Sequence, residues 1–252
     1  MKNKFSWLRS VLLYAPLYAL ATIVYGAVSL SCSYWDATGR RQHRVAQAWA
    51  RMLLRIAGIR VTVVGGENLI TDRPCVMVCN HLSYMDVPVL FARLPLQFRI
   101  LAKQGLFSIP FLGGHLKRSQ HLPVDQENTR ASLRSLLKAA DSVAQGLPVF
   151  VFPEAGRSFD GRMKEFVPGA FFVAVQAQVP IVAMVLVGTR EALEPHTVHL
   201  RPHPVELIIC PPVATTGLTR KNVDALAQQV REQMMQIYRE RHGDEAVPSP
   251  VA

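Results

Sequence analysis

The sequence predicts an α/β fold, in which a mixed, mostly parallel sheet with covering helices follows a membrane-associated helical segment. Two observations lead to this prediction. Short apolar runs alternate with amphipathic stretches from Gly58 onward, whereas residues 11–30 form one long apolar run without a charge. We therefore divide the 252 residues into a membrane-associated helical segment at 1–57, a globular domain at 58–242 and a tail at 243–252.

The uncharged segment 11–30 is about as long as a helix that crosses a hydrocarbon core of about 30 Å. Pro16, Gly26 and positive charges on both flanks leave open whether it spans the membrane or lies in it. In the next helix, one face is basic and the adjoining face is apolar, as is typical of a helix at an anionic membrane surface; the basic residues are Arg40, Arg41, Arg44, Arg51 and Arg55. A core-packed helix with a solvated basic face is the alternative.

Composition narrows the class of partner. Half of the residues are apolar, 18% are charged and the net charge is +10, which suits nucleic acid, anionic membranes or phosphorylated small molecules. Because no basic run is interleaved with aromatic residues, we expect no nucleic acid partner. The four cysteines show no spacing typical of a metal site or a disulfide, which indicates a reduced, cytoplasmic setting. The histidines of HTVHLRPH are interpreted as loop residues, so we expect no bound metal.

The predicted strands share a short apolar run that ends at turn residues. In chain order they are IRVTVVG at 59–65, CVMVC at 75–79, FRILA at 98–102, LPVFVF at 147–152, VPIVAMVLVG at 179–188 and VELIIC at 205–210. Helical patterns cover residues 83–94, the stretch after the N-cap candidate Asn128, and a C-terminal segment from Val223 to Ile237.

A histidine and an aspartate follow the second predicted strand, in VMVCNHLSYMDVPVL. His81 lies in a strand-to-helix loop, where sites form in open α/β sheets, and Asp86 lies in the first turn of the helix. His81 can act as a general base whose other ring nitrogen is held by Asp86. Alternatively, Asp86 only caps the helix with Ser83, and His81 is an ordinary interior histidine.

The predicted strand at 147–152 is also followed by a polar loop, FPEAGRS, which brings Glu154 and Arg157 to a strand end. The planar fork of donors on Arg157 suits a phosphate. The alternative is a surface Glu–Arg pair of little energetic value.

Four blocks between about Val61 and Val187 resemble, in order, those of the glycerolipid acyltransferases, typified by the 1-acylglycerol-3-phosphate acyltransferases. They are NHLSYMD, KQGLFSIPFLGG with HLPVDQ, FPEAGRS and VPIVAMVLVG. Several positions depart from the family pattern. Gln126 stands where the second block has arginine, so that contact is missing or supplied by another residue such as Arg118; Ala155 and Gly156 replace the usual Gly and Thr, and Ala183 replaces a proline.

The resemblance implies an acyltransferase domain that moves a fatty acyl group from acyl carrier protein or coenzyme A to the free hydroxyl of 1-acylglycerol-3-phosphate, making phosphatidic acid for phospholipid synthesis without a cofactor. His81 would be the base and Asp86 its support. Lys103 and Arg157 would bind the phosphate, with Glu154 positioning Arg157 or the glycerol. An acyl groove is predicted along Phe107, Ile109, Phe111 and Leu112. The protein would lie at the inner (cytoplasmic) membrane, with its active site on the cytoplasmic face.

Other functions stay open at this stage. The altered second and third blocks allow a different lysolipid acceptor, such as a lyso-aminolipid. A serine-type lipid hydrolase is disfavoured because the chain has no G-x-S-x-G turn. Retention of His81, Asp86, Glu154 and Arg157 argues against a noncatalytic membrane-binding protein. The sequence leaves the donor carrier, the acyl-chain length and the oligomeric state undetermined.

Overall fold

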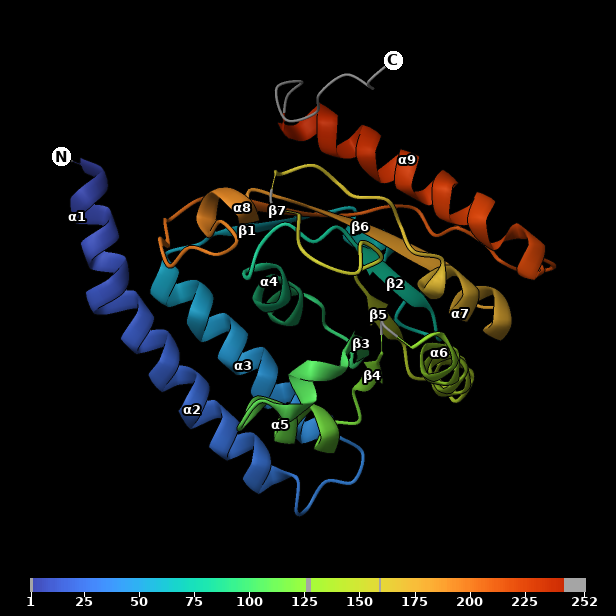
Figure 1. The fold of residues 1–252 in the computed structure, drawn as a ribbon, viewed down its shortest axis with the longest axis horizontal. Helices are drawn as coiled ribbons and strands as arrows, with labels where there is room; N and C mark the ends of the chain where they lie inside the picture. Colours follow the sequence, from blue (N-terminus) through green and yellow to red (C-terminus); the bar gives the residue numbers. More distant parts are fainter. Residues whose placement is uncertain (1, 126–127, 159, 243–252) are drawn as a thin grey trace.

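One sheet of seven strands lies at the centre of the computed structural model, which describes residues 2–125, 128–158 and 160–242 (Figure 1). The strand order is β1-β7-β6-β2-β5-β3-β4, and every neighbouring pair is parallel except β6 and β7. The strands are β1 Val61–Val64, β2 Val76–Cys79, β3 Arg99–Lys103, β4 Leu122–Val124, β5 Val149–Val151, β6 Ile181–Val187 and β7 Val205–Ile209. The predicted mixed, mostly parallel sheet is confirmed.

The central strands are buried on both faces. All residues of β2 are buried, as are the first six of β6, which explains why they read as continuous apolar runs instead of alternating ones. The strand β4 was not predicted. It has only three residues, including Pro123, and pairs only with β3 at the edge of the sheet, where a proline is tolerated.

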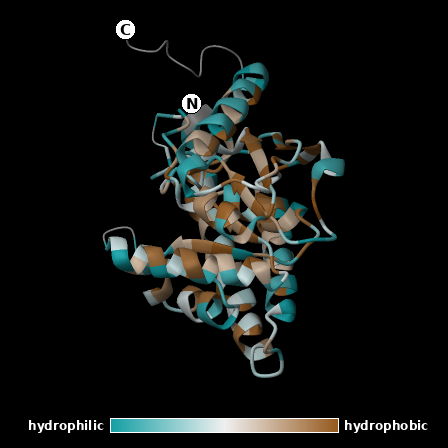
Figure 2. Cartoon of the chain, turned by 90° about the vertical axis from the view of Figure 1, so that its right-hand side faces the viewer, coloured by the Kyte–Doolittle hydropathy of each residue, from teal (hydrophilic) through white to brown (hydrophobic). Residues whose placement is uncertain are grey.

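Helices cover both faces of the sheet, and alternate residues of β2 belong to different cores. Val76 and Val78 pack in the core beneath α6, α7 and α9, whereas Met77 and Cys79 pack in the core beneath α3 and α4. The covering helices are α3 Arg40–Ala57, α4 Asp86–Arg93, α6 Thr129–Ala144, α7 Gly169–Ala177 and α9 Val223–His242. In Figure 2 the central strands are mostly brown, the colour of apolar residues, whereas α9 alternates teal and brown.

Shorter elements connect these layers. They are α5 Leu112–Arg118, α8 Thr189–Ala192, and the turns η2 Gly66–Asn68, η3 Gln104–Ser108 and η4 Arg220–Asn222. Neither α5 nor α7 was predicted. The helix α7 is apolar on nearly every side and buried, so it shows no amphipathic period, and α5 is too short to show one.

The N-terminal segment forms one nearly continuous helix that runs antiparallel to α3 (Figure 1). It consists of α1 Lys2–Arg9, a π-helical turn η1 Ser10–Tyr14 and α2 Ala15–Cys32. The helix Lys4–Cys32 is long and apolar enough to cross a membrane, since it contains an 18-residue window with a mean hydropathy of 1.8. Large apolar side chains on the outer side are strongly exposed, among them Leu12, Leu20 and Ile23.

Polar side chains tie the other side of this helix to the globular domain along most of its length. Ser10 Oγ donates to the carbonyl of Leu200, and the Tyr18 hydroxyl donates to the carbonyl of Leu53. Further ties are Ser6 with His199, Thr22 with Trp49 and Ser29 with His115. The basic face predicted for α3 is exposed, at Arg40, Arg41, Arg44, Arg51 and Arg55. The helix therefore lies flat against the domain and presents an apolar outer side.

Candidate active site

The predicted site residues of the first and third blocks meet at one edge of the sheet. His81 follows the end of β2, and Glu154 and Arg157 follow the end of β5. Because β2 and β5 are parallel neighbours, their carboxyl ends lie side by side. Loops at such an edge are where open α/β sheets form ligand sites.

His81 and Asp86 form a buried hydrogen-bonded pair. Their Nδ1 and Oδ2 atoms are 2.8 Å apart; the Asp86 side chain is fully buried, and the His81 side chain retains 10% exposure. The imidazole stacks on the Phe152 ring, with centroids 3.8 Å apart. Since the carboxylate accepts from Nδ1, the other nitrogen, Nε2, is left as the basic atom, and no residue in the described ranges hydrogen-bonds to it.

Asp86 also holds the loop that carries His81. Its Oδ2 accepts hydrogen bonds from the backbone N–H groups of Leu82 and Ser83, each at 2.8 Å, and Asp86 is the first residue of α4. One carboxylate oxygen thus holds the imidazole and also binds the backbone of the loop that leads into α4, whose N-cap is Met85. The Ser83 hydroxyl has other partners, since it accepts from Met85 N–H and donates to the Leu193 carbonyl.

Glu154 contacts the backbone of His81, and no hydrogen bond or ion pair joins it to Arg157 in the described part of the chain. Its Oε1 accepts from His81 N–H at 2.7 Å and its Oε2 from Lys164 N–H at 2.8 Å. Burial raises the pKa of Glu154 to about 7, although these two hydrogen bonds act in the opposite direction. The prediction that Glu154 positions Arg157 does not match these contacts, because the carboxylate joins two loops beneath His81.

Arg157 lies next to the histidine loop with much of its fork unused. Its Nε donates to the Ser83 carbonyl at 3.2 Å, and its guanidinium lies 4.0 Å from the centroid of the Tyr84 ring. Burial lowers its pKa, and the nearby Asp86 carboxylate acts in the opposite direction. Within the described residues, its two terminal nitrogens have no hydrogen-bond partner. Stacking on Tyr84 thus holds a donor fork at the site.

The structure separates the remaining candidate cations. Lys103 is the exposed last residue of β3, at the same sheet edge as His81 but two strands away, or about 10 Å at the usual strand spacing. Arg118 is not near the site: it donates to Ser33 Oγ at 2.8 Å and stacks on Tyr34, in the turn between α2 and α3. It therefore cannot replace the missing arginine of the second block, and Gln126 lies outside the described residues.

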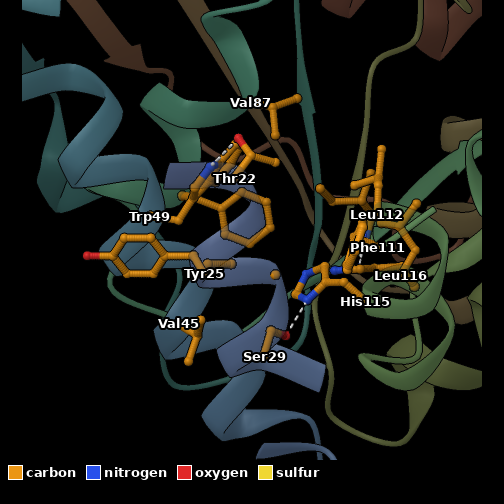
Figure 3. Close-up of a pocket in the computed structure, with 15 residues that line it drawn as sticks. Thr22, Tyr25, Ser29, Val45, Trp49, Val87, Phe111, Leu112, His115 and Leu116 are labelled. Carbon is orange, nitrogen blue, oxygen red and sulfur yellow. Dashed lines mark hydrogen bonds between the residues drawn. The ribbon is translucent and has the colours of Figure 1, made fainter. Parts of the chain in front are cut away.

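The predicted acyl groove is only partly a groove. Phe111 and Leu112 line an apolar cavity of about 130 Å³ between α2, α3, α4 and α5 (Figure 3), whereas the buried Phe107 and the exposed Ile109 do not line it. Phe111 has a positive φ of 61°, an uncommon backbone conformation for a bulky residue.

Residues distant in the sequence form the rest of this cavity. They include Tyr25 and Gly26 of α2, Val45 and Trp49 of α3, and Val87 of α4, the residue after Asp86. At one end, Ser29 Oγ and His115 Nδ1 are 2.6 Å apart (Figure 3). Burial lowers the pKa of His115 to about 4, so this end is polar but uncharged near neutral pH.

Two aromatic residues of the site were not identified from the sequence. Phe152 and Tyr84 stack on His81 and Arg157, respectively. Both lie inside the family blocks, Tyr84 in NHLSYMD and Phe152 in FPEAGRS, so their position beside the site residues could have identified them. Apart from Phe111 and Leu112, the walls of the cavity gave no local signal in the sequence.

The buried carboxylate of Glu154 predicts a pH-dependent difference in stability. Its folded pKa lies above the ordinary value of 4.5, so the folded protein binds this proton more readily and gains stability as pH falls from about 7 to 4.5. A shift of this size corresponds to about 3 kcal/mol. The free energy of urea unfolding of the wild type should therefore rise relative to Glu154→Gln between about pH 8 and pH 5. A pH-independent difference between the two proteins would contradict the buried carboxylate.

Comparison with known proteins is consistent with this arrangement. A 1-acyl-sn-glycerol-3-phosphate acyltransferase of Chlamydomonas reinhardtii is 33% identical over 90% of this chain, which spans 66% of that protein. The Homo sapiens 1-acyl-sn-glycerol-3-phosphate acyltransferase alpha is 34% identical over 75% of this chain and 68% of its own length.

The fold also matches the crystal structure of the 1-acyl-sn-glycerophosphate acyltransferase from Thermotoga maritima. That match has a TM-score of 0.79 and 23% identity and covers 96% of this chain and all of the other. A sequence profile described as Acyltransferase matches residues 60–187, which include the strands β1 to β6 and the loops that carry His81, Glu154 and Arg157. The chain belongs to the acyltransferase family.

Proposed function

We propose that this acyltransferase transfers a fatty acyl group from a thioester to the free hydroxyl of 1-acylglycerol-3-phosphate, making phosphatidic acid. The observation that supports this most directly is the His81–Asp86 pair, whose Nε2 has no hydrogen-bond partner among the described residues, in a loop that also binds Arg157 through the Ser83 carbonyl. The names of the relatives from Chlamydomonas reinhardtii and Homo sapiens point to the same acceptor.

The reaction needs a base and a thioester, and no covalent enzyme intermediate. Nε2 of His81 removes the proton from the lipid hydroxyl as its oxygen bonds to the thioester carbonyl carbon. The carbon–sulfur bond then breaks, and the thiolate takes the proton from the imidazolium, which restores the neutral histidine. Asp86 holds Nδ1–H and stabilises the transient positive charge.

Arg157 is proposed to bind the acceptor phosphate, with Lys103 as a more distant cation at the same edge of the sheet. The Tyr84 ring and the Ser83 carbonyl fix the guanidinium plane, so little conformational entropy is lost when it binds. Since Arg118 is directed elsewhere, the phosphate site depends strongly on Arg157. This dependence is also why a lysolipid with another headgroup is a second candidate acceptor.

A serine hydrolase is poorly supported by the geometry. In the described part of the chain no serine hydroxyl hydrogen-bonds to the His81 ring. Ser83 and Ser158, the serines nearest to it in the two loops, bond to Leu193 and Asp160, respectively. Neither is oriented as a nucleophile activated by His81.

The function is tested by offering the purified protein lysophosphatidic acid with acyl-coenzyme A or acyl carrier protein thioester and weighing the product by mass spectrometry. Phosphatidic acid is expected. His81→Ala should lower kcat by about 10²–10⁴ while binding of the lysolipid persists, because only the base is removed. Product from a lyso-aminolipid alone would favour the second acceptor, and wild-type turnover in His81→Ala would contradict the assignment.

Arg157→Ala should raise the KM for lysophosphatidic acid by about 10- to 100-fold, since a hydrogen bond between charged groups is lost. The KM for the thioester should change little. Arg118→Ala is the matched control, because it removes an equal charge that stacks on Tyr34 away from the site. Equal effects of Arg157→Ala on both substrates would contradict a dedicated phosphate role.

The protein is membrane-associated, and we place it on one leaflet, at the cytoplasmic face of the inner membrane. Polar ties from Ser6 to Ser29 hold both ends of the apolar helix to the same domain, so the helix lies along the surface. Lipid quenchers should therefore report similar depths for Trp7 and Trp35 in single-tryptophan variants. Quenching of one tryptophan from each leaflet would indicate a spanning helix.

The apolar cavity is proposed to hold the acyl chain of a substrate, entering between the membrane-facing helices. A Cβ at Gly26 would lie 3.6 Å from Cβ of Phe111, in ordinary contact, so a longer side chain there fills the cavity. Gly26→Leu should lower kcat/KM for long acyl chains by about tenfold or more relative to short ones, and Gly26→Ala should not. An unchanged chain-length profile in Gly26→Leu would exclude the cavity.

A further inference from the structure

Asn80, the residue before His81, continues the sheet with its side chain. The backbone ladder between β2 and β6 ends where Cys79 pairs with Met184. One step further, Asn80 Nδ2 donates to the carbonyl of Leu186 at 2.9 Å, and Asn80 Oδ1 accepts from Leu186 N–H at 2.7 Å. The amide is completely buried and satisfies both backbone groups of Leu186.

Because the Asn80 side chain pairs with Leu186, the backbone of His81 is not part of the hydrogen-bond ladder between β2 and β6. The N–H of His81 donates to Glu154, and its carbonyl accepts from Ser158 N–H at 3.0 Å. Both partners belong to the loop after β5. The histidine is thus held between β6, through Asn80, and the β5 loop, and its ring reaches Asp86.

We propose that Asn80 is a positioning residue for the acyl-transfer reaction, which fixes the place of the His81 imidazole by pairing with β6. Asparagine suits this position because its short amide carries a donor and an acceptor in one plane, as a peptide group does. Aspartate lacks the donor, alanine lacks both groups, and glutamine is longer by a methylene. The inference rests on the proposed role of His81 as the base.

Asn68 offers a matched control. Its Nδ2 donates to the carbonyl of Ile209, the last residue of β7, at 2.9 Å. Ile209 is in register with Met184 of β6, which pairs with Cys79 of β2, so this bond lies two strands from β2, or about 10 Å at the usual strand spacing. Asn68→Ala therefore also removes a bond from a side-chain amide to a strand, but none of the hydrogen bonds that hold His81.

The experiment compares Asn80→Ala and Asn68→Ala in the full-length protein, by steady-state kinetics, thermal unfolding and modification of His81 with diethyl pyrocarbonate, read by peptide mass spectrometry. We expect kcat of Asn80→Ala to fall by about 10²-fold, the loss typical of a base misplaced by about 1 Å, with both KM values within about threefold. In Asn80→Ala, diethyl pyrocarbonate should modify His81 faster than in the wild type. The midpoint of the acidic limb in a plot of kcat against pH should also move. Asn68→Ala should lower the melting temperature and leave these readouts unchanged.

A folded Asn80→Ala protein with kcat within about twofold of the wild type would overturn the proposal, as would equal kinetic losses in both variants. If Asn80→Ala does not fold, Asn80→Ser, which retains one polar group, is held to the same outcomes. A wild type without activity on lysophosphatidic acid would instead refute the proposed function, and the modification rate of His81 would still test the role of Asn80.

Discussion

The site depends on the convergence of three N–H groups on one oxygen atom. Oδ2 of Asp86 receives the imidazole Nδ1–H and the backbone N–H groups of Leu82 and Ser83. Burying a polar side chain is costly unless it is hydrogen-bonded, so the burial of Asp86 depends on the loop keeping this shape. The orientation of His81 and the start of α4 therefore depend on the same side chain, Asp86.

Much of the fold could be predicted because local patterns determine it. Apolar runs mark six of the seven strands, and the alternation of strands with amphipathic helices indicates the sheet. His81 and Asp86 were identifiable because their contact spans only five residues and follows a strand end. The strand β4 escaped prediction because Pro123 interrupts its short pattern, and α7 because it is buried on nearly every side.

The rest of the site arises from contacts that no local pattern reveals. Glu154 reaches His81 across 73 positions, and Asn80 reaches Leu186 across 106. Sequence proximity to the blocks wrongly suggested Arg118, whose side chain follows the turn between α2 and α3 instead. The uncommon φ of Phe111, which places that ring against α2, likewise follows from packing and not from residue type.

The position of the apolar cavity gives the amphiphilic helices a second purpose. Tyr25 and Gly26 of α2 and Trp49 of α3 form one of its walls, so the part of the chain that meets lipid also shapes the pocket. A shortened form prepared without residues 1–39 to ease handling would dissolve more readily but lose the α2 part of that wall, including Tyr25 and Gly26. If the cavity holds the acyl chain as proposed, a change to this helix that improves solubility would also change the chain lengths that the enzyme accepts.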